Sequence, residues 1–143
     1  MSAASPSVFS RIVSGEIPAH KVYEDAHVLA FLDVGPLAPG HVLLIPKGEF
    51  ATMDAVPEDV AAALGRVLPR LVRAVQSATG APGINVLQNN GKVSGQEVMH
   101  VHFHLIPRQA GDGLGYRWNP GKYAPGEAEK LRDQLSLLLT DPA

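Results

Sequence analysis

Cysteine is absent from the 143-residue chain. Its absence excludes disulfide bonds, thiolate catalysis and any zinc or iron–sulfur site built on cysteine ligands. Long apolar runs are lacking as well, since no stretch approaches the roughly 20 residues of a membrane-spanning helix. No basic segment followed by an apolar run opens the chain. We therefore expect no signal peptide, no membrane partner and a cytoplasmic protein.

An excess of positive charge is also missing. The chain has 12 Lys and Arg residues against 14 Asp and Glu residues, a formal net charge of −2. Nucleic-acid-binding proteins usually present a basic face, and the one dense basic group here (Arg66, Arg70 and Arg73) falls on a predicted helix, where a solvated face explains it. We expect no polymeric nucleic acid as partner. A small anionic ligand stays compatible with this balance, because one site can be positive inside a neutral protein.

The remaining composition is that of a folded protein, with 45% apolar and 18% charged residues. Periodicity predicts a short helix at 7–15, a long helix at 57–79 and a final helix at 125–139. Strands are predicted at 22–24, 27–33, 41–45, 84–88 and 100–106. Short successive strands and tight turns favour an α+β domain, an antiparallel sheet of about five strands with helices packed on it. We expect a flexible N-terminus over 1–6 and a single domain over 7–143, its core reaching about residue 120.

Two prolines interrupt the predicted elements. Pro69 lies within the apolar stripe of the long helix, where we expect a kink. Pro46 follows the apolar run 41–45, so it either ends that strand or places it at the edge of the sheet.

Three of the six histidines fall within the run HVHFHLI at residues 100–106. Alternate residues of a strand share one face, so the apolar residues would face the core and the imidazoles of His100, His102 and His104 would line the other face. Neighbouring positions on that face are about 6.6 Å apart. Imidazoles reaching from them can surround one phosphate group.

Histidine suits phosphate chemistry because it titrates near neutrality. One imidazole can be a neutral nucleophile while its neighbours donate protons, and a covalent intermediate splits one difficult displacement into two easier ones. His102 is flanked on both sides and is the candidate nucleophile. Two other interpretations remain open for the same pattern. One is a satisfied polar strand face without function, and the other is an open three-histidine zinc site, which is weakened because Glu97 is the nearest carboxylate.

The polar loop before this run contains Asn89, Ser94, Gly95 and Gln96, which offer donors to an anion. A hairpin rich in turn-forming residues is the structural alternative. His41 opens an apolar strand, and taken alone it would be a core histidine. Asp33 ends another strand and could simply begin the turn.

Residues 100–106 resemble the signature of the histidine triad (HIT) family, in which three histidines alternate with apolar residues. The flanks agree, since Gly95-Gln96 precedes the run and Pro107-Arg108 follows it. Further landmarks occur in the family's order: Ile17-Pro18, Tyr23-Glu24-Asp25, Phe31-Leu32-Asp33, Ala38-Pro39-Gly40-His41 and Ile45-Pro46-Lys47. The resemblance covers about residues 7–120. It is greatest to the bacterial branch related to Hint, with some similarity to the Fhit branch around Pro107-Arg108.

The resemblance implies a homodimer whose sheet continues across both chains, and nucleotidyl transfer to water. His102 would attack the α-phosphorus, and the main-chain carbonyl of His100 would hold the His102 ring in its reactive tautomer. His104, His41 and Asn89 match positions that contact the phosphate or shape the pocket. Gln96 matches a loop position near the phosphates, with Glu97 beside it, and Asp33 matches the position that binds the ribose hydroxyls. Candidates for the base pocket are Phe9, Ile12, Phe31, Val34 and Leu43.

Two departures from the family pattern carry weight. Many bacterial relatives hold a structural zinc ion with Cys-x-x-Cys near the N-terminus and a later histidine, where this chain has Ser7, Ser10 and Glu49. Serine hydroxyls are poor zinc ligands, so we expect no zinc and no other cofactor. Glu97 replaces a serine that many Hint relatives place beside the leaving group, which puts efficient phosphoramidase activity in question.

These observations favour an enzyme that hydrolyses purine nucleoside phosphoramidates or dinucleoside polyphosphates at the α-phosphate. A nucleotide-binding regulatory module with vestigial turnover is the alternative that Glu97 supports. A zinc hydrolase built on the same histidines is the third hypothesis.

Overall fold

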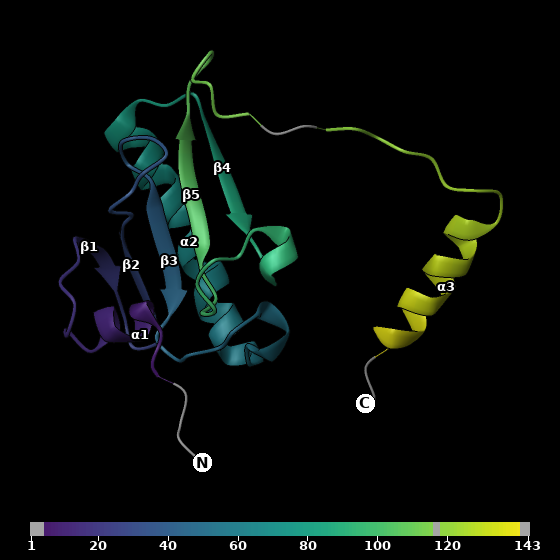
Figure 1. Ribbon diagram of the computed structural model, residues 1–143, viewed down its shortest axis with the longest axis horizontal. Coiled ribbons are helices and arrows are strands. Elements are labelled where there is room, and N and C mark those ends of the chain that lie inside the picture. The colour runs from purple at the N-terminus through teal and green to yellow at the C-terminus, as the bar shows by residue number, and fades with distance from the viewer. Residues whose placement is uncertain (1–4, 116–117, 141–143) are drawn as a thin grey trace.

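The sheet of the computed structural model has five strands in the order β1-β2-β3-β5-β4, and every neighbouring pair is antiparallel (Figure 1). The structure describes residues 5–115 and 118–140, so most of the N-terminus expected to be flexible lies outside the described residues. The strands are β1 (Lys21–Glu24), β2 (Val28–Leu32), β3 (Val42–Pro46), β4 (Gly83–Gln88) and β5 (Phe103–Arg108). The predicted α+β class and strand count are confirmed.

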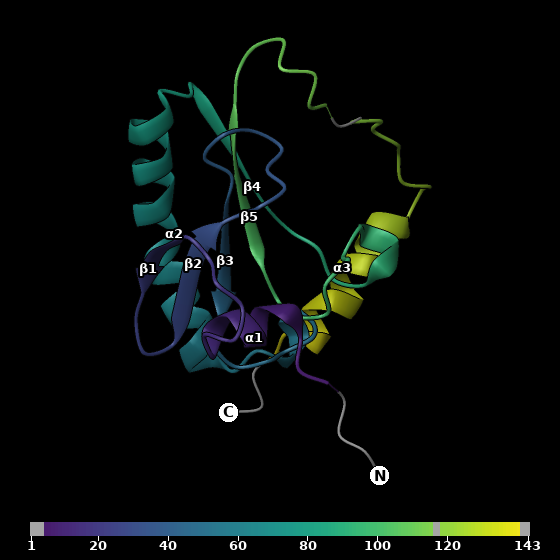
Figure 2. The same cartoon turned by 60° about the vertical axis from the view of Figure 1, so that its left-hand side comes forward.

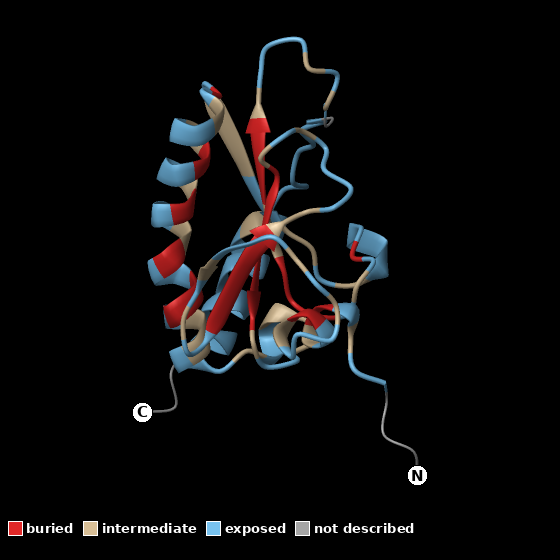
Figure 3. Ribbon diagram, turned by 90° about the vertical axis from the view of Figure 1, so that its left-hand side faces the viewer, coloured by how far each residue is buried: buried red, intermediate tan, exposed pale blue. Residues whose placement is uncertain are grey.

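The long helix α2 (Glu58–Thr79) covers one face of this sheet. Its first turn carries Glu58 and Asp59, which favour the positive end of the helix dipole. Gly80 ends it with φ of 69°, a left-handed conformation that glycine adopts without strain. Its buried residues lie in one stripe towards the sheet (Figure 3). They pack on alternate residues of the strands: Val28, Ala30, Val42, Leu44 and Leu105.

The short helix α1 (Val8–Val13) lies over the opposite face. The Ser7 side chain accepts a hydrogen bond from the N–H of Ser10 and so caps this helix, as predicted. Phe9 and Ile12 pack against the strand residues that point away from α2, namely Leu29, Phe31, Leu43 and Ile45. Because β2 and β3 are covered on both faces, they read in the sequence as continuous apolar runs.

The two prolines have different outcomes. Pro46 is the last residue of β3, which is an interior strand paired with both β2 and β5, so the edge alternative is wrong. Its missing N–H is tolerated because the pairing with β5 extends only over Val42–Leu44. Pro69 lies inside α2, which is one continuous helix over Glu58–Thr79. The kink expected at this position stays a prediction.

Two short 3₁₀-helices, η1 (Met53–Ala55) and η2 (Lys92–Ser94), lie in the connections before α2 and β5. The last helix, α3 (Glu127–Leu138), begins two residues later than predicted and lies apart from the sheet (Figures 1 and 2). Its leucines are exposed, with Leu135 at 56% and Leu138 at 80%. The expectation that this helix packs on the sheet is therefore wrong for the single chain. No helix among the described residues is long and apolar enough to cross a membrane.

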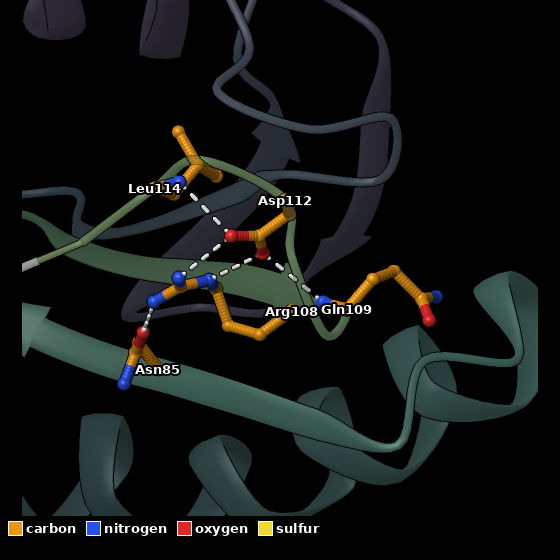
Figure 4. A network of polar contacts seen from close by, with 5 residues as sticks. All are labelled: Asn85, Arg108, Gln109, Asp112 and Leu114. Atoms are coloured by element: carbon orange, nitrogen blue, oxygen red, sulfur yellow. Dashed lines mark hydrogen bonds and ion pairs between the residues drawn. The ribbon is translucent and has the colours of Figure 1, made fainter.

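A polar network fixes the turn after β5, from which the chain leaves the sheet (Figure 4). The guanidinium of Arg108 donates to both carboxylate oxygens of Asp112, at 2.7 and 2.9 Å, and also to the side chain of Asn85 on β4. Asp112 accepts two further bonds, from the N–H groups of Gln109 and Leu114. These bonds, led by that from Arg108, lower the pKa of Asp112 to about 2.

Replacing Asp112 by Asn is expected to lower the free energy of unfolding at pH 7. The ionised carboxylate binds its partners in the folded state and has its ordinary pKa when unfolded, so its contribution is present above pH 4 and is lost as pH falls towards 2. Urea denaturation of the wild type and the variant at pH 7 and pH 3 measures the difference in their free energy of unfolding. Asp133→Asn, which alters the exposed Arg132–Asp133 pair, is the control. Equal stabilities at pH 7, or a difference that stays constant at low pH, would contradict the assignment.

Candidate functional site

A cavity of about 260 Å³ opens on the α1 face of the sheet. It is lined by Phe9, Asp33, Leu43, Gly95, Glu97, Val98, His102 and His104. Two larger hollows along the C-terminal arm are lined by residues of 121–134 and contain no histidine. Among the cavities lined by described residues, this one contains His102, His104 and two carboxylates, the groups suited to catalysis.

The residues that line the cavity come from several strands of the sheet and the connections between them. His104 lies on β5, with His102 directly before that strand. Asp33 follows β2 and Leu43 lies on β3, to one side of β5. The connection that includes Gly95 lies between β5 and its other neighbour, β4. The cavity therefore has a β2–β3 side, formed by Asp33 and Leu43, and residues of the β4–β5 connection complete its lining beside the two histidines.

The tautomer of His102 is fixed by one hydrogen bond. Its Nδ1 lies 2.7 Å from the main-chain oxygen of His100, and because a carbonyl oxygen only accepts, Nδ1 carries the proton. The unprotonated Nε2 is left with its lone pair. The Phe9 ring lies edge-on at 5.0 Å between ring centroids. The hydrogen bond from Nδ1 of His102 to the carbonyl of His100 is the contact that the family resemblance implies.

His104 and His41 form a second pair with the opposite tautomer. The N–H of Leu37 donates to Nδ1 of His41 at 3.1 Å, so neutral His41 carries its proton on Nε2. That Nε2 lies 2.9 Å from Nδ1 of His104 and donates to it. His104 must then carry its own proton on Nε2. Among the described residues, the chain of donors thus leaves the Nε2–H of His104 without a partner, where a neutral His102 ring has a lone pair.

Burial keeps this pair neutral near pH 7. Burial is the largest cause that lowers the pKa of His104 to about 4, and positive charge on His102 or His41 lowers it further. Burial also lowers the pKa of His41 and outweighs the opposing effect of Asp33. The 3.7 Å approach of Asp33 to Nε2 of His41 is therefore between a carboxylate and a neutral ring.

The prediction that all three motif histidines line one strand face is wrong for His100. β5 begins at Phe103, because the N–H of Val101 donates to the main-chain oxygen of Phe50 instead of a strand partner. His100 is fully buried. Its Nε2 donates to the carbonyl of Pro46 at 2.9 Å, so its Nδ1 accepts from the Ser7 hydroxyl at 2.6 Å. The three histidines therefore do not form one ligand set for zinc.

The remaining predicted binding residues have different places. Gln96 is buried, and its side chain is engaged within the chain: it accepts from the N–H of Gly91 and donates to the carbonyls of Ala51 and Val98. The side chain of Gln96 thus holds this loop beside the cavity, and its place near the phosphates stays a prediction. Val34 is 87% exposed and is not among the described residues that line the cavity, so its place in a base pocket also stays a prediction.

Asn89 lies beside Gly95 of the cavity lining, and Glu97 is part of that lining. Gly95 has φ of 108°, and a Cβ there would lie 3.4 Å from Nδ2 of Asn89. The glycine thus leaves room for this amide beside the cavity. Glu97 is an exposed residue of the lining.

Sequence analysis missed the backbone groups that set the histidine tautomers. The N–H of Leu37 and the carbonyl of Pro46 are main-chain groups. Such groups occur at nearly every residue, so the sequence does not show which of them bind a histidine. Val98 was also missed as part of the lining, and its place beside Glu97 in the polar loop was the available hint.

Two clusters contain groups able to bind metals. Ligand atoms of Asp33, His41 and His104 lie within 4.8 Å of one another, but the two histidine nitrogens already share a hydrogen bond. The other cluster joins Ser7, Ser10 and Glu49 to His100. Glu49 accepts from the Ser7 N–H at 2.6 Å and from the Ser10 hydroxyl at 2.7 Å, and these bonds lower its pKa. The groups of this second cluster already bind one another through hydrogen bonds, and none of them is a thiolate.

Neutral buried histidines make stability depend on pH. The pKa of His104 is lowered when folded and ordinary when unfolded, so the unfolded chain binds more protons between pH 6.5 and 4, and stability falls as pH falls through that window. We expect a smaller fall in His104→Gln, measured by urea denaturation across this range. His20→Gln, which changes an exposed histidine, is the control. Equal slopes for wild type and His104→Gln would contradict the assignment.

Comparison with known proteins agrees with this architecture. A family model described as the HIT domain matches residues 14–111. An uncharacterized HIT-like protein of Methanocaldococcus jannaschii is 47% identical over 74% of this chain and 81% of its own length. An adenosine 5'-monophosphoramidase of Schizosaccharomyces pombe is 42% identical over 90% of this chain and 95% of its own. The crystal structure of a HIT family member from Bacillus subtilis superposes with a TM-score of 0.90 at 36% identity, covering 96% of this chain and 99% of that one.

Proposed function

The chain belongs to the histidine triad (HIT) family, and from this premise we propose that it is a hydrolase of purine nucleotides that acts at the α-phosphate. The substrates are nucleoside phosphoramidates or dinucleoside polyphosphates, and the product is a nucleoside monophosphate. The observation that carries the proposal is the pair of opposite tautomers, the lone pair on His102 beside the N–H of His104. The phosphoramidase name of the yeast relative supports the reaction class.

His102 is the nucleophile in this proposal. Its Nε2 attacks the α-phosphorus, an N–P bond forms, and the bond from phosphorus to the leaving group breaks. The leaving group departs with the electron pair and takes up a proton. Water then attacks the phosphorus of the nucleotidyl-histidine, the P–N bond breaks, and His102 is regenerated. The carbonyl of His100 accepts from Nδ1 throughout and stabilises the positive charge that the ring acquires.

Charge on the phosphate oxygens is met by His104. Its Nε2–H is the free donor that the His41 hydrogen bond leaves available. A donor held in place before the reaction costs no reorganisation when charge develops. His41 acts through His104 as a positioning residue, since it is buried and both its ring nitrogens are engaged. Asn89, beside Gly95, is placed to add an amide donor.

The nucleoside is assigned to the β2–β3 side of the cavity. One oxygen of Asp33 accepts from the N–H of Gly35, and the other oxygen is available to accept from ribose hydroxyls. Phe9 and Leu43 line the same cavity and offer apolar surface to a base. The purine preference rests on the family resemblance.

The chain is proposed to act as a homodimer. β4 pairs with β5 on one edge only in the described chain, and its Val86 and Leu87 are 44% and 39% exposed. Pairing of β4 with the same strand of a second copy would continue the sheet. The exposed leucines of α3 would then have a partner surface to pack on.

A nucleotide-binding regulatory module is the second candidate. The observation in its favour is Glu97, whose carboxylate at the cavity opposes the approach of anionic phosphates. Tight binding of AMP with no turnover of any tested nucleotide would support this alternative.

We also propose that the chain needs no structural zinc. Where relatives of the Cys-x-x-Cys type place metal ligands, the Ser7 hydroxyl donates to His100, and Glu49 accepts from the Ser7 N–H and the Ser10 hydroxyl. Protein expressed with added zinc and dialysed is expected to contain far less than one zinc atom per chain by mass spectrometry, and to unfold at the same temperature with or without a chelator. One tightly bound zinc atom per chain would contradict this.

The test of function is the release of AMP from adenosine 5'-phosphoramidate and from diadenosine tetraphosphate, with chelator in every sample. His102→Ala is expected to lower turnover about a thousandfold or more, because the nucleophile is lost. AMP binding by calorimetry should change little. His20→Ala, which changes an exposed histidine outside the cavity lining, is the matched control. Undiminished turnover in His102→Ala would end the assignment, and turnover that appears only without chelator would point to a zinc hydrolase.

A further inference from the structure

We propose that Glu97 is a specificity-determining residue, whose carboxylate in the lining of the cavity selects nucleoside phosphoramidates with a cationic leaving amine over dinucleoside polyphosphates. This inference rests on the proposed function and narrows its substrate class. The leaving amine in question carries a second, positively charged nitrogen remote from the bond that is cleaved.

The two carboxylates of the cavity have different neighbours. The carboxylate of Asp33 lies 3.7 Å from Nε2 of His41 and forms one cluster with His41 and His104. Glu97 lines the same cavity from the connection between β4 and β5 and does not belong to that cluster. With the nucleoside at Asp33 and Leu43, as proposed, Glu97 is the carboxylate left for the group beyond the α-phosphate.

The charges of the lining disfavour a polyphosphate. The eight described residues of the lining include two carboxylates and no lysine or arginine. The histidine donors can serve one phosphate group, but His104 is kept neutral, since burial and its neighbours lower its pKa to about 4. Each further phosphate of a dinucleoside polyphosphate would add negative charge near Glu97, where these described residues supply no cation. Repulsion of this kind discriminates between substrates as effectively as attraction does.

The carboxylate of Glu97 is available to a ligand. Among the described residues it takes part in no hydrogen bond or ion pair, in contrast to Glu49, which is occupied by Ser7 and Ser10. The residue is exposed, so ligand contact requires no buried charge to be created. An ammonium group about 4 Å away would gain a modest attraction, and the same carboxylate would repel a phosphate at similar range.

The reaction itself does not change under this proposal. Nε2 of His102 forms the bond to phosphorus, the P–N bond to the amine breaks, and the departing nitrogen takes up one proton. The second nitrogen of the amine keeps its proton and stays beside Glu97. The carboxylate therefore acts on binding and orientation of the leaving group, not as a proton donor.

Three substrates differ in the charge of the leaving group. They are AMP linked through a P–N bond to putrescine (cationic), AMP linked in the same way to n-butylamine (neutral), and diadenosine tetraphosphate (anionic). For the wild type we expect kcat/KM for the putrescine compound to exceed that for the butylamine compound about tenfold at low salt. The preference should shrink as salt is added, because screening weakens exposed charge pairs.

Glu97→Gln keeps the size of the side chain and removes its charge. We expect this variant to lose the putrescine preference and to gain severalfold in kcat/KM for diadenosine tetraphosphate. Glu58→Gln, which removes a carboxylate at the exposed start of α2, should leave both ratios as in the wild type. Unchanged ratios in Glu97→Gln, or a wild-type enzyme that prefers diadenosine tetraphosphate, would overturn the inference.

Failure of the inference is distinguishable from failure of the proposed function. If the wild type cleaves the butylamine compound with dependence on His102 but shows no charge preference, the reaction stands and the role of Glu97 falls. If no compound is cleaved, the proposed function itself fails and the inference falls with it.

Discussion

The hydrogen bond from Nδ1 of His102 to the carbonyl of His100 is the interaction on which the rest of the site depends. At 2.7 Å it fixes which ring nitrogen carries the proton, and it thereby decides that a lone pair is available to the cavity. The carbonyl can hold this position because the His100 side chain is itself anchored to Pro46 and Ser7. The buried His100 thus supports the ring of His102, the proposed nucleophile.

Neutrality is the second constraint on the site. Four histidines lie close together, and burial lowers the pKa of His41, His100 and His104. Neutral rings can alternate as donors and acceptors, which protonated rings cannot do. The chain from Leu37 through His41 to His104 is possible only under that condition. Burial therefore allows this chain of hydrogen bonds to keep the proton of His104 on Nε2, and it lowers the stability of the fold in mild acid.

Much of this arrangement could be predicted from the sequence. The apolar stripe of residues 57–79 predicted α2. The alternation of residues 103–106 correctly predicted that Phe103 and Leu105 face the core, where they pack with residues of that helix. The same alternation failed for His100, because the strand begins only at Phe103 and a backbone bond to Phe50 takes the chain out of the sheet. Periodicity describes side-chain faces within a strand and does not show where pairing stops. Motif position also does not reveal whether a side chain turns inward, as that of Gln96 does, or outward, as that of Val34 does.

The most direct test of the account is the tautomer of His102, observed by two-bond proton–nitrogen correlation NMR on ¹⁵N-labelled protein near pH 7. The account predicts that His102 carries its proton on Nδ1, while His41 and His104 carry theirs on Nε2. A spectrum with His102 protonated on Nε2 would remove the lone pair from the cavity and contradict the central claim.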